Sequence, residues 1–170
     1  MSQIKIINQS QIVLMEQIFS ILKVTSHGEG FTNITNQINQ FIKENNLSSG
    51  MLIISSMHTS CSLTINENAD PNVLSDLKKY MQAIVPYNSY VNLSKDPKET
   101  YYDHYQEGED DMPAHIKTAL TNTSLSLSFR NERLILGQWQ AIYLWEHRFD
   151  KKERTLNLHI IGEKTKHIYN

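Results

Sequence analysis

The stretch MHTSCSLTINENADP, residues 57–71, decides much of the fold. It follows an apolar run at residues 51–54, which predicts a buried strand. Over residues 59–65, hydroxyl side chains alternate with apolar ones, and this period of two predicts a second, half-buried strand. The other side chains of the stretch are mostly polar and come directly after a strand. We therefore expect them to face either solvent or a functional site.

Three segments carry helix signals. Residues 32–45 place apolar side chains three and four positions apart, on one face of a helix. Asp70 and Pro71 suit the N-cap and the first position of a second helix. A short third helix is predicted to begin at Pro113 and to be capped by Asp111.

The remaining regular segments alternate between apolar and polar residues. Strands are predicted at residues 11–24, 124–129 and 155–162, and over residues 133–147 as one long strand or two broken near Gly137. We expect the last three segments to form an antiparallel meander. The predicted fold class is α+β: a single compact domain over residues 1–170, with two to three helices and a dominant antiparallel sheet curled into a sandwich or barrel.

Composition excludes several classes of protein. The 16 basic and 18 acidic residues give a net charge of -2, without the clustered basic excess that binds nucleic acid. No apolar run approaches the roughly 20 residues that span a membrane, and no signal peptide is predicted. The single cysteine, Cys61, excludes an internal disulfide. We expect a cytoplasmic protein that binds neither nucleic acid nor membrane.

Polar clusters gather at the ends of the predicted elements. Residues 87–111 have no clear period but contain five tyrosines, which predicts a long, ordered and functional loop. Imidazole is a frequent metal ligand and a good acid or base near neutral pH. The candidates are His58, His104, His115 and His147, which could coordinate a divalent metal together with Glu146. Their spacing matches no standard zinc motif, so the alternative is a set of unconnected histidines.

Phosphate and magnesium also have candidate ligands. The hydroxyls of Thr59 and Ser60 could hold a phosphate, or they could occupy the solvent face of a strand. Arg148 could clamp an anion with two hydrogen bonds, or it could pair with a carboxylate at the surface. Residues 109–111 are acidic and could bind Mg²⁺, although we favour helix capping for Asp111.

Several long motifs together resemble one protein family. HTSCSLTINENADPNVLSDL (residues 58–77), HYQEGEDDMPAHIK (residues 104–117) and RLILGQWQAIYLWEHR (residues 133–148) are similar to the YjbQ family, whose members are often named secondary thiamine-phosphate synthase. Gln138 and Ala141 depart from the family's usual GTWQGIYL. The resemblance runs from about residue 12 to residue 163. It implies a β-rich fold assembled as a trimer, with a polar pocket between subunits that holds a metal or an anion.

The resemblance also implies roles for individual residues. The family's motifs match at His58, Asn66, Glu67, His104, His115 and Glu146, and the EHR form adds His147. We expect a metal at His104, His115 and His147, with His58, His115 and Glu146 as catalytic residues. The expected substrate-binding residues are Thr59, Ser60, Asn66, Glu67 and Arg148. Imidazoles favour zinc, whereas pyrophosphate chemistry usually employs magnesium.

The implied activity joins a hydroxymethylpyrimidine pyrophosphate to a thiazole phosphate. The pyrimidine carbon loses pyrophosphate and the thiazole nitrogen attacks it, so the site must stabilise the departing negative charge. Two other classes remain open. One is a metal-dependent hydrolase that cleaves an ester or a phosphate. The other is a non-catalytic protein that binds a small phosphorylated ligand.

Overall fold

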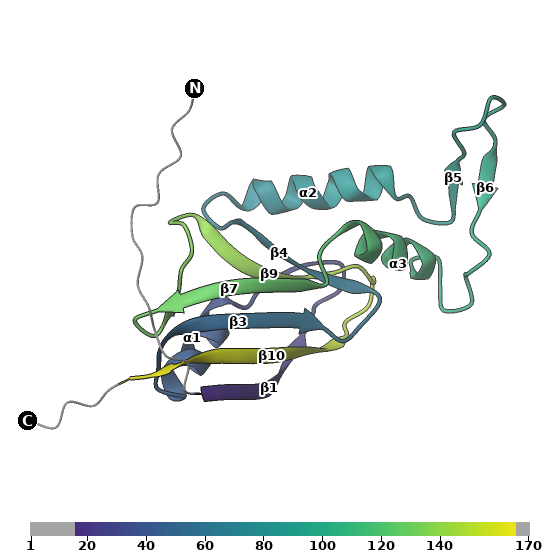
Figure 1. Ribbon diagram of the computed structural model, residues 1–170. Coiled ribbons are helices and arrows are strands. Elements are labelled where there is room, and N and C mark those ends of the chain that lie inside the picture. Colours follow the sequence, from purple (N-terminus) through teal and green to yellow (C-terminus); the bar gives the residue numbers. More distant parts are fainter. Residues whose placement is uncertain (1–15, 166–170) are drawn as a thin grey trace, which may run out of the picture.

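A five-stranded antiparallel sheet forms the larger layer of the molecule (Figure 1). The computed structural model describes residues 16–165. The strand order is β1–β10–β3–β7–β8, with bounds Glu16–Thr25, Glu153–Lys164, Leu47–Ser56, Ser124–Arg130 and Arg133–Leu134. Alternate residues of β10, namely Leu156, Leu158 and Ile160, are buried. One face of this sheet is therefore a wall of the hydrophobic core.

A three-stranded antiparallel sheet covers that core from the other side. Its order is β2–β9–β4, with bounds Gly30–Asn33, Gln140–Glu146 and Cys61–Glu67. The core cluster joins Leu63 and Leu144 of this sheet to Leu52 of the larger one. Two of the helices, α2 (Pro71–Ile84) and α3 (Asp111–Leu120), lie over the outer side of the small sheet (Figure 1). Because β9 is central and covered on both faces, all its residues after Gln140 are buried.

Three helices complete the body. α1 (Thr35–Glu44) buries Ile38 and Ile42 against the sheets. α2 (Pro71–Ile84) begins where the sequence predicts, because the Asp70 side chain accepts a hydrogen bond from the Asn72 backbone at 2.8 Å. α3 (Asp111–Leu120) packs against β4. Within residues 16–165, no helix is long and apolar enough to cross a membrane.

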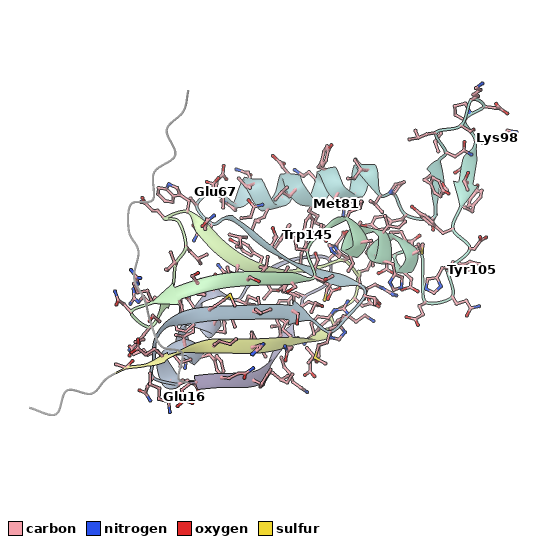
Figure 2. All side chains as sticks on the ribbon, in the orientation of Figure 1. Glu16, Glu67, Met81, Lys98, Tyr105 and Trp145 are labelled. Atoms are coloured by element: carbon pink, nitrogen blue, oxygen red, sulfur yellow. The ribbon has the colours of Figure 1, made fainter. Side chains whose placement is uncertain are left out.

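A hairpin projects from the body between α2 and α3 (Figure 1). It consists of β5 (Ser89–Val91) and β6 (Glu99–Tyr101), which pair in antiparallel fashion. Figure 2 shows Lys98 near the tip of the hairpin and Tyr105 near its base. The sequence predicts one long loop over residues 87–111, and this is wrong where β5 and β6 pair within that segment.

The α+β class with mainly antiparallel strands is confirmed, and so is the break near Gly137. The first hairpin of the predicted meander is confirmed, because β7 pairs with β8 in antiparallel fashion, but the rest of the meander is wrong. β7 pairs with β3 and β8, β9 pairs with β2 and β4, and β10 pairs with β1 and β3. Alternation shows that a segment is a strand but carries no information about its neighbour, which long-range packing selects. Residues 11–15 of the first predicted strand lie outside the described residues.

Candidate metal centre

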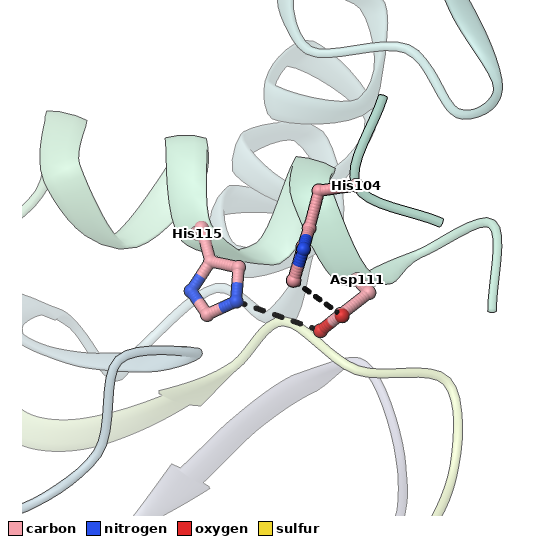
Figure 3. Close-up of side chains that lie close together, drawn as sticks. All are labelled: His104, Asp111 and His115. Atoms are coloured by element: carbon pink, nitrogen blue, oxygen red, sulfur yellow. Dashed lines mark ion pairs between the residues drawn. The ribbon is translucent and has the colours of Figure 1, made fainter. Parts of the chain in front are cut away.

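The first turn of α3 and the loop before it bring two imidazoles to one carboxylate (Figure 3). Asp111 is the first residue of α3 and His115 lies one turn later, so both side chains lie on the same face of the helix. His104 reaches the same carboxylate from the loop between β6 and α3. One ligand atom from each residue lies within 4.8 Å of the other two. We call these three residues the His–Asp cluster.

The distances in the His–Asp cluster fit a divalent metal. His104 Nε2 lies 2.9 Å from Asp111 Oδ2, and His115 Nε2 lies 3.6 Å from Asp111 Oδ1. Two ligand atoms of a tetrahedral zinc lie roughly 3.4 Å apart when each is about 2.1 Å from the ion. Two imidazoles and one carboxylate also form a ligand set that catalytic zinc uses, with a further position left open. The His104 side chain is 55% exposed and that of His115 is 33% exposed, so a small molecule can reach them.

One oxygen of Asp111 is buried without a hydrogen-bond donor. Oδ1 accepts from Nη1 of Arg148, whereas Oδ2 accepts from no group among the described residues. His104 Nε2 is close enough to Oδ2 for an ion pair, but its ring does not direct an N–H at the oxygen. His104 Nε2 and Asp111 Oδ2 are therefore close together without forming a hydrogen bond. The three ligand atoms lie close enough together to share one ion, and a cation there would remove the cost of the unpaired oxygen.

A backbone carbonyl fixes the tautomer of His115. Its Nδ1 lies 2.9 Å from the carbonyl oxygen of Thr59. A carbonyl can only accept, so the proton of the neutral ring sits on Nδ1 and Nε2 presents a lone pair toward Asp111. A carbonyl bonded to the second ring nitrogen is the common support of a metal-binding histidine. Thr59, predicted to bind substrate, thus contributes its backbone here.

Arg148 holds the acidic end of α3 in place. Its Nε donates to Asp110 Oδ2 at 3.1 Å, its Nη1 donates to Asp111, and its Nη2 donates to the carbonyl of Glu107 at 2.7 Å. Asp110 Oδ2 also accepts from the backbone N–H of Phe149 at 2.7 Å. The guanidinium is buried and engaged by protein groups, so it positions Asp111. That Arg148 clamps a substrate anion stays a prediction.

His58 and Ser60 lie beside the cluster, between β3 and β4. His58 Nε2 accepts from the backbone N–H of Thr155 at 2.7 Å. Burial, and then the charge of Arg154, lower the pKa of His58. The Ser60 hydroxyl accepts from Arg154 Nη2 at 3.1 Å. His58 and His115 line the same pocket, and the catalytic role of His58 stays a prediction.

Glu146 lies in a buried ion pair. Arg154 donates to both its oxygens, through Nε to Oε2 at 2.7 Å and through Nη2 to Oε1 at 2.5 Å. Oε1 also accepts from the backbone N–H groups of His147 and Arg148. Burial raises the pKa of Glu146, but the hydrogen bonds from Arg154 and from the Arg148 backbone outweigh it, and the net pKa is lowered. Glu146 fixes the turn after β9, and its catalytic role stays a prediction.

His147 points into the protein interior, away from the His–Asp cluster. Its Nε2 lies 2.9 Å from the Ser62 hydroxyl, and its buried Nδ1 has no hydrogen-bond partner among residues 16–165. Burial, and then the charge of Lys117, lower the pKa of His147 to about 3, so the ring is neutral at pH 7. In the described part of the chain, His147 belongs to no group of three metal-binding side chains.

Asn66 and Glu67 lie at the far end of β4. Cys61 pairs with Glu146 at one end of this strand, and Glu67 pairs with Gln140 at the other. A seven-residue strand is about 20 Å long. Figure 2 accordingly shows Glu67 and Tyr105 at opposite ends of the molecule. The structure therefore does not bring these two predicted substrate-binding residues to the His–Asp cluster.

The sequence offers Asp111 as one of three possible magnesium ligands, but helix capping is the favoured role and Asp111 is not grouped with the histidines as a ligand. The sequence predicts α3 to begin at Pro113 with Asp111 as its cap, which is wrong. The helix begins at Asp111 with no side-chain cap, because the carboxylate instead meets Arg148 and the two histidines. The sequence feature that could have joined Asp111 to His115 is their four-residue spacing, which places both side chains on one helical face.

Two pockets flank the cluster. One, of about 500 Å³, contains His104 and is lined largely by tyrosines, including Tyr101, Tyr102 and Tyr105. The other, of about 510 Å³, contains His58 and His115. Both have the size of small-molecule sites.

The fold and the site together define a class: an α+β protein of two packed antiparallel sheets and a projecting hairpin, with a His–Asp cluster open to small molecules. The model of the family "UPF0047 protein YjbQ-like" matches residues 20–163. The chain belongs to this YjbQ family.

Individual relatives cover almost the same region. The chain is 38% identical to a UPF0047 protein of Synechocystis over 84% of this chain and 90% of that protein. It is 36% identical to UPF0047 protein YjbQ of Escherichia coli O157:H7, over 84% of this chain and 96% of that protein. A solved YjbQ/UPF0047 structure from Clostridium acetobutylicum is 33% identical with a TM-score of 0.65, and covers 84% of this chain and 98% of that chain.

Proposed function

We propose that this protein is a divalent-metal-dependent enzyme acting on a small phosphorylated molecule. The observation that carries the proposal is the buried Oδ2 of Asp111, which lacks a donor and lies beside two imidazoles. His104, Asp111 and His115 would hold the metal. The predicted third histidine, His147, is replaced in this proposal by Asp111, because His147 points into the interior.

Zinc is the metal that suits these residues better. Two of the three ligands are imidazoles, which a borderline metal prefers, whereas magnesium prefers oxygen ligands and retains several waters. The supporting contacts also fit, because Thr59 fixes the tautomer of His115 and Arg148 fixes Asp111.

The reaction we propose is the one that the family resemblance implies, in which a pyrimidine pyrophosphate and a thiazole phosphate are joined. A bound cation would supply positive charge opposite the departing pyrophosphate. The protein's own residues would orient the reactants: His58 offers a neutral imidazole from one side, and the Tyr101, Tyr102 and Tyr105 side chains line the other. Arg148 would keep Asp111 in position through the reaction.

A metal-dependent hydrolase is the second candidate. It is supported by the same ligand set, because three protein ligands with an open position also occur in zinc hydrolases. The two candidates differ in their products, since only the first forms a bond between two organic reactants. A binding protein for a phosphorylated ligand would yield no product.

We also propose that the protein assembles as a homotrimer, with the site near a subunit interface. Support comes from exposed apolar side chains on α2 and in the hairpin region, namely Tyr80, Ile84, Leu93 and Tyr101. Tyr101 also lines the pocket that contains His104. Light scattering should give three times the 19.7 kDa chain mass. A chain-sized particle at micromolar concentration would contradict the trimer.

The test of function starts from metal-free protein. Calorimetric titration with zinc and with magnesium should show zinc binding, which His104→Ala and His115→Ala each abolish while circular dichroism stays unchanged. His27→Ala, at an exposed histidine, is the matched control. Chromatography of the loaded protein with both reactants should then reveal thiamine phosphate. Release of phosphate alone would favour the hydrolase, and unchanged metal binding in both variants would reject the proposal.

A further inference from the structure

The pocket on the His115 side of the cluster is lined by hydroxyl groups and carries no charged side chain. Its polar lining comes from Ser56, His58, Thr59, Thr118, Thr121 and Thr123, with His115 shared with the cluster. We call it the hydroxyl pocket. Because no Lys, Arg, Asp or Glu lines it, its chemistry suits an uncharged group that makes hydrogen bonds.

Thr118 supplies a buried hydroxyl with no partner. Only 7% of the residue is exposed, and its Oγ1 makes no hydrogen bond within the described part of the chain. Its neighbour Thr121, in contrast, donates to the backbone carbonyl of Lys117 at 2.7 Å. A buried hydroxyl without a partner costs free energy unless something else bonds to it. Thr118 lines the hydroxyl pocket, so a ligand bound there could form this hydrogen bond.

His58 supplies an oriented donor. A backbone N–H can only donate, so the bond from Thr155 to Nε2 requires the proton of the neutral ring to be on Nδ1. The backbone N–H of His58 in turn donates to the Ser56 hydroxyl at 3.2 Å, which anchors the residue. Within the described residues, His58 Nδ1–H donates to no acceptor. His58 therefore offers a fixed N–H, while His115 offers the lone pair of Nε2 on the cluster side.

We propose that the hydroxyl pocket binds the uncharged part of the substrate that accepts hydrogen bonds, such as a ring nitrogen or an oxygen, with the Thr118 hydroxyl and His58 Nδ1–H as donors. The proposal rests on the proposed function for the placement of the phosphate, which the cation at the His–Asp cluster would hold. His115 belongs to both sites, so a phosphate and a polar group separated by a few bonds can occupy them together. This arrangement selects phosphorylated molecules whose uncharged part accepts hydrogen bonds over bare phosphate.

The experiment compares three probes: ribose, ribose 5-phosphate and inorganic phosphate. In metal-free protein, ribose at millimolar concentration should shift the amide NMR signals of Thr118, Thr121 and Thr123. In zinc-loaded protein, ribose 5-phosphate should bind more tightly than inorganic phosphate. Thr118→Val should lower the affinity for ribose 5-phosphate by roughly 2- to 10-fold, the range for one hydrogen bond. The affinity for inorganic phosphate should remain unchanged. Thr118→Ser, which retains the hydroxyl, should bind as the wild type does.

Thr64→Val is the matched control, because this β4 threonine lines neither of the two pockets that flank the cluster. The stability of Thr118→Val should equal or exceed that of the wild type, since the lost hydroxyl has no protein partner. Equal affinity of both phosphates in the wild type, or an unchanged ribose 5-phosphate affinity in Thr118→Val, would overturn the proposal. A failure of the protein to bind zinc would reject the metal site. The ribose titration needs no metal, so the NMR shifts of Thr118, Thr121 and Thr123 would still test the hydroxyl pocket.

Discussion

Two clusters of charged residues lie along α3, and they differ in how completely they are satisfied. Around Glu29, Lys117 Nζ and the Tyr87 hydroxyl donate to Oε1 at 2.6 and 2.7 Å, and Gln82 donates to Oε2 at 2.6 Å. Both carboxylate oxygens have donors, and the Lys117 side chain is 1% exposed. In the His–Asp cluster, the Asp111 side chain is 3% exposed, yet one oxygen has no donor and the imidazoles reach solvent.

The difference separates a structural ion pair from a candidate site. Burial, and then the hydrogen bond to Glu29, raise the pKa of Tyr87 far above its usual value, so Tyr87 remains a donor. Lys117 also stacks 4.5 Å from the centre of the Tyr87 ring. The carboxylate of the Glu29 cluster therefore has no unpaired oxygen that could bind a ligand. The His–Asp cluster has an unpaired oxygen beside two pockets. This unpaired oxygen separates the two clusters more clearly than burial does.

The largest effect should follow from breaking the Glu29 cluster. Lys117→Met removes the ammonium but retains the length of the side chain, which leaves buried Glu29 with only the partly exposed Lys78, whose Nζ lies 3.7 Å from Oε2. We expect the free energy of unfolding to fall by about 3–5 kcal/mol in urea denaturation. Lys79→Met is the control, because Lys79 pairs with Asp76 in an exposed salt bridge, and it should change stability by less than about 1 kcal/mol. Equal stability of Lys117→Met and wild type would remove the distinction between the two clusters.

The next effect concerns the His–Asp cluster itself. Asp111→Asn retains shape but removes the negative charge, and we expect zinc affinity to fall by more than about 100-fold, since loss of a supporting contact alone costs 10- to 100-fold. Asp110→Asn is the control, because Asp110 contacts Arg148 and Phe149 without facing either histidine. Calorimetry that finds the same loss in both variants would assign Asp111 to support rather than to binding.

A third prediction uses the buried His147. Its pKa of about 3 lies below the unfolded value of about 6.5, so the unfolded chain binds more protons between these values and stability falls as pH falls. Between pH 6.5 and 4.5 we expect a loss of about 1.4 kcal/mol per pH unit from this residue. Glu29 and Glu146, whose pKa values are lowered, lose their contribution only at lower pH.

The measurement is urea denaturation across that pH range for wild type and His147→Gln. The variant should have the shallower slope, whatever its absolute stability. Parallel slopes would mean that His147 is protonated in the folded protein, contrary to its burial.

The smallest effect is expected for Arg148→Lys. Lysine cannot reach Asp110, Asp111 and the Glu107 carbonyl together, so Asp111 should lose its fixed orientation. We expect zinc affinity to fall about 10-fold in calorimetry. Arg133→Lys, on the exposed β8, is the control. A loss of affinity for inorganic phosphate with zinc affinity intact would instead support the predicted anion clamp.

Local chemistry was sufficient for several features that the sequence predicts. The start of α2 depends on Asp70 and the backbone two residues later, a contact that lies within one turn. The alternating strands and the α+β class follow from side-chain period, which is also a local property. The residue types of the site, histidine above all, can be named because their chemistry does not depend on the fold.

Tertiary structure decided which of those residues meet. Asp111 leaves its predicted capping position because Arg148, 37 residues later, takes its carboxylate. Glu146, at the end of β9, points inward because β9 is buried on both faces, and alternation cannot distinguish such a strand from one with a solvent face. His104 and His115 converge because a hairpin occupies the chain between α2 and α3. These outcomes depend on contacts between distant segments, whose free energy is set by packing and charge pairing that no local pattern encodes.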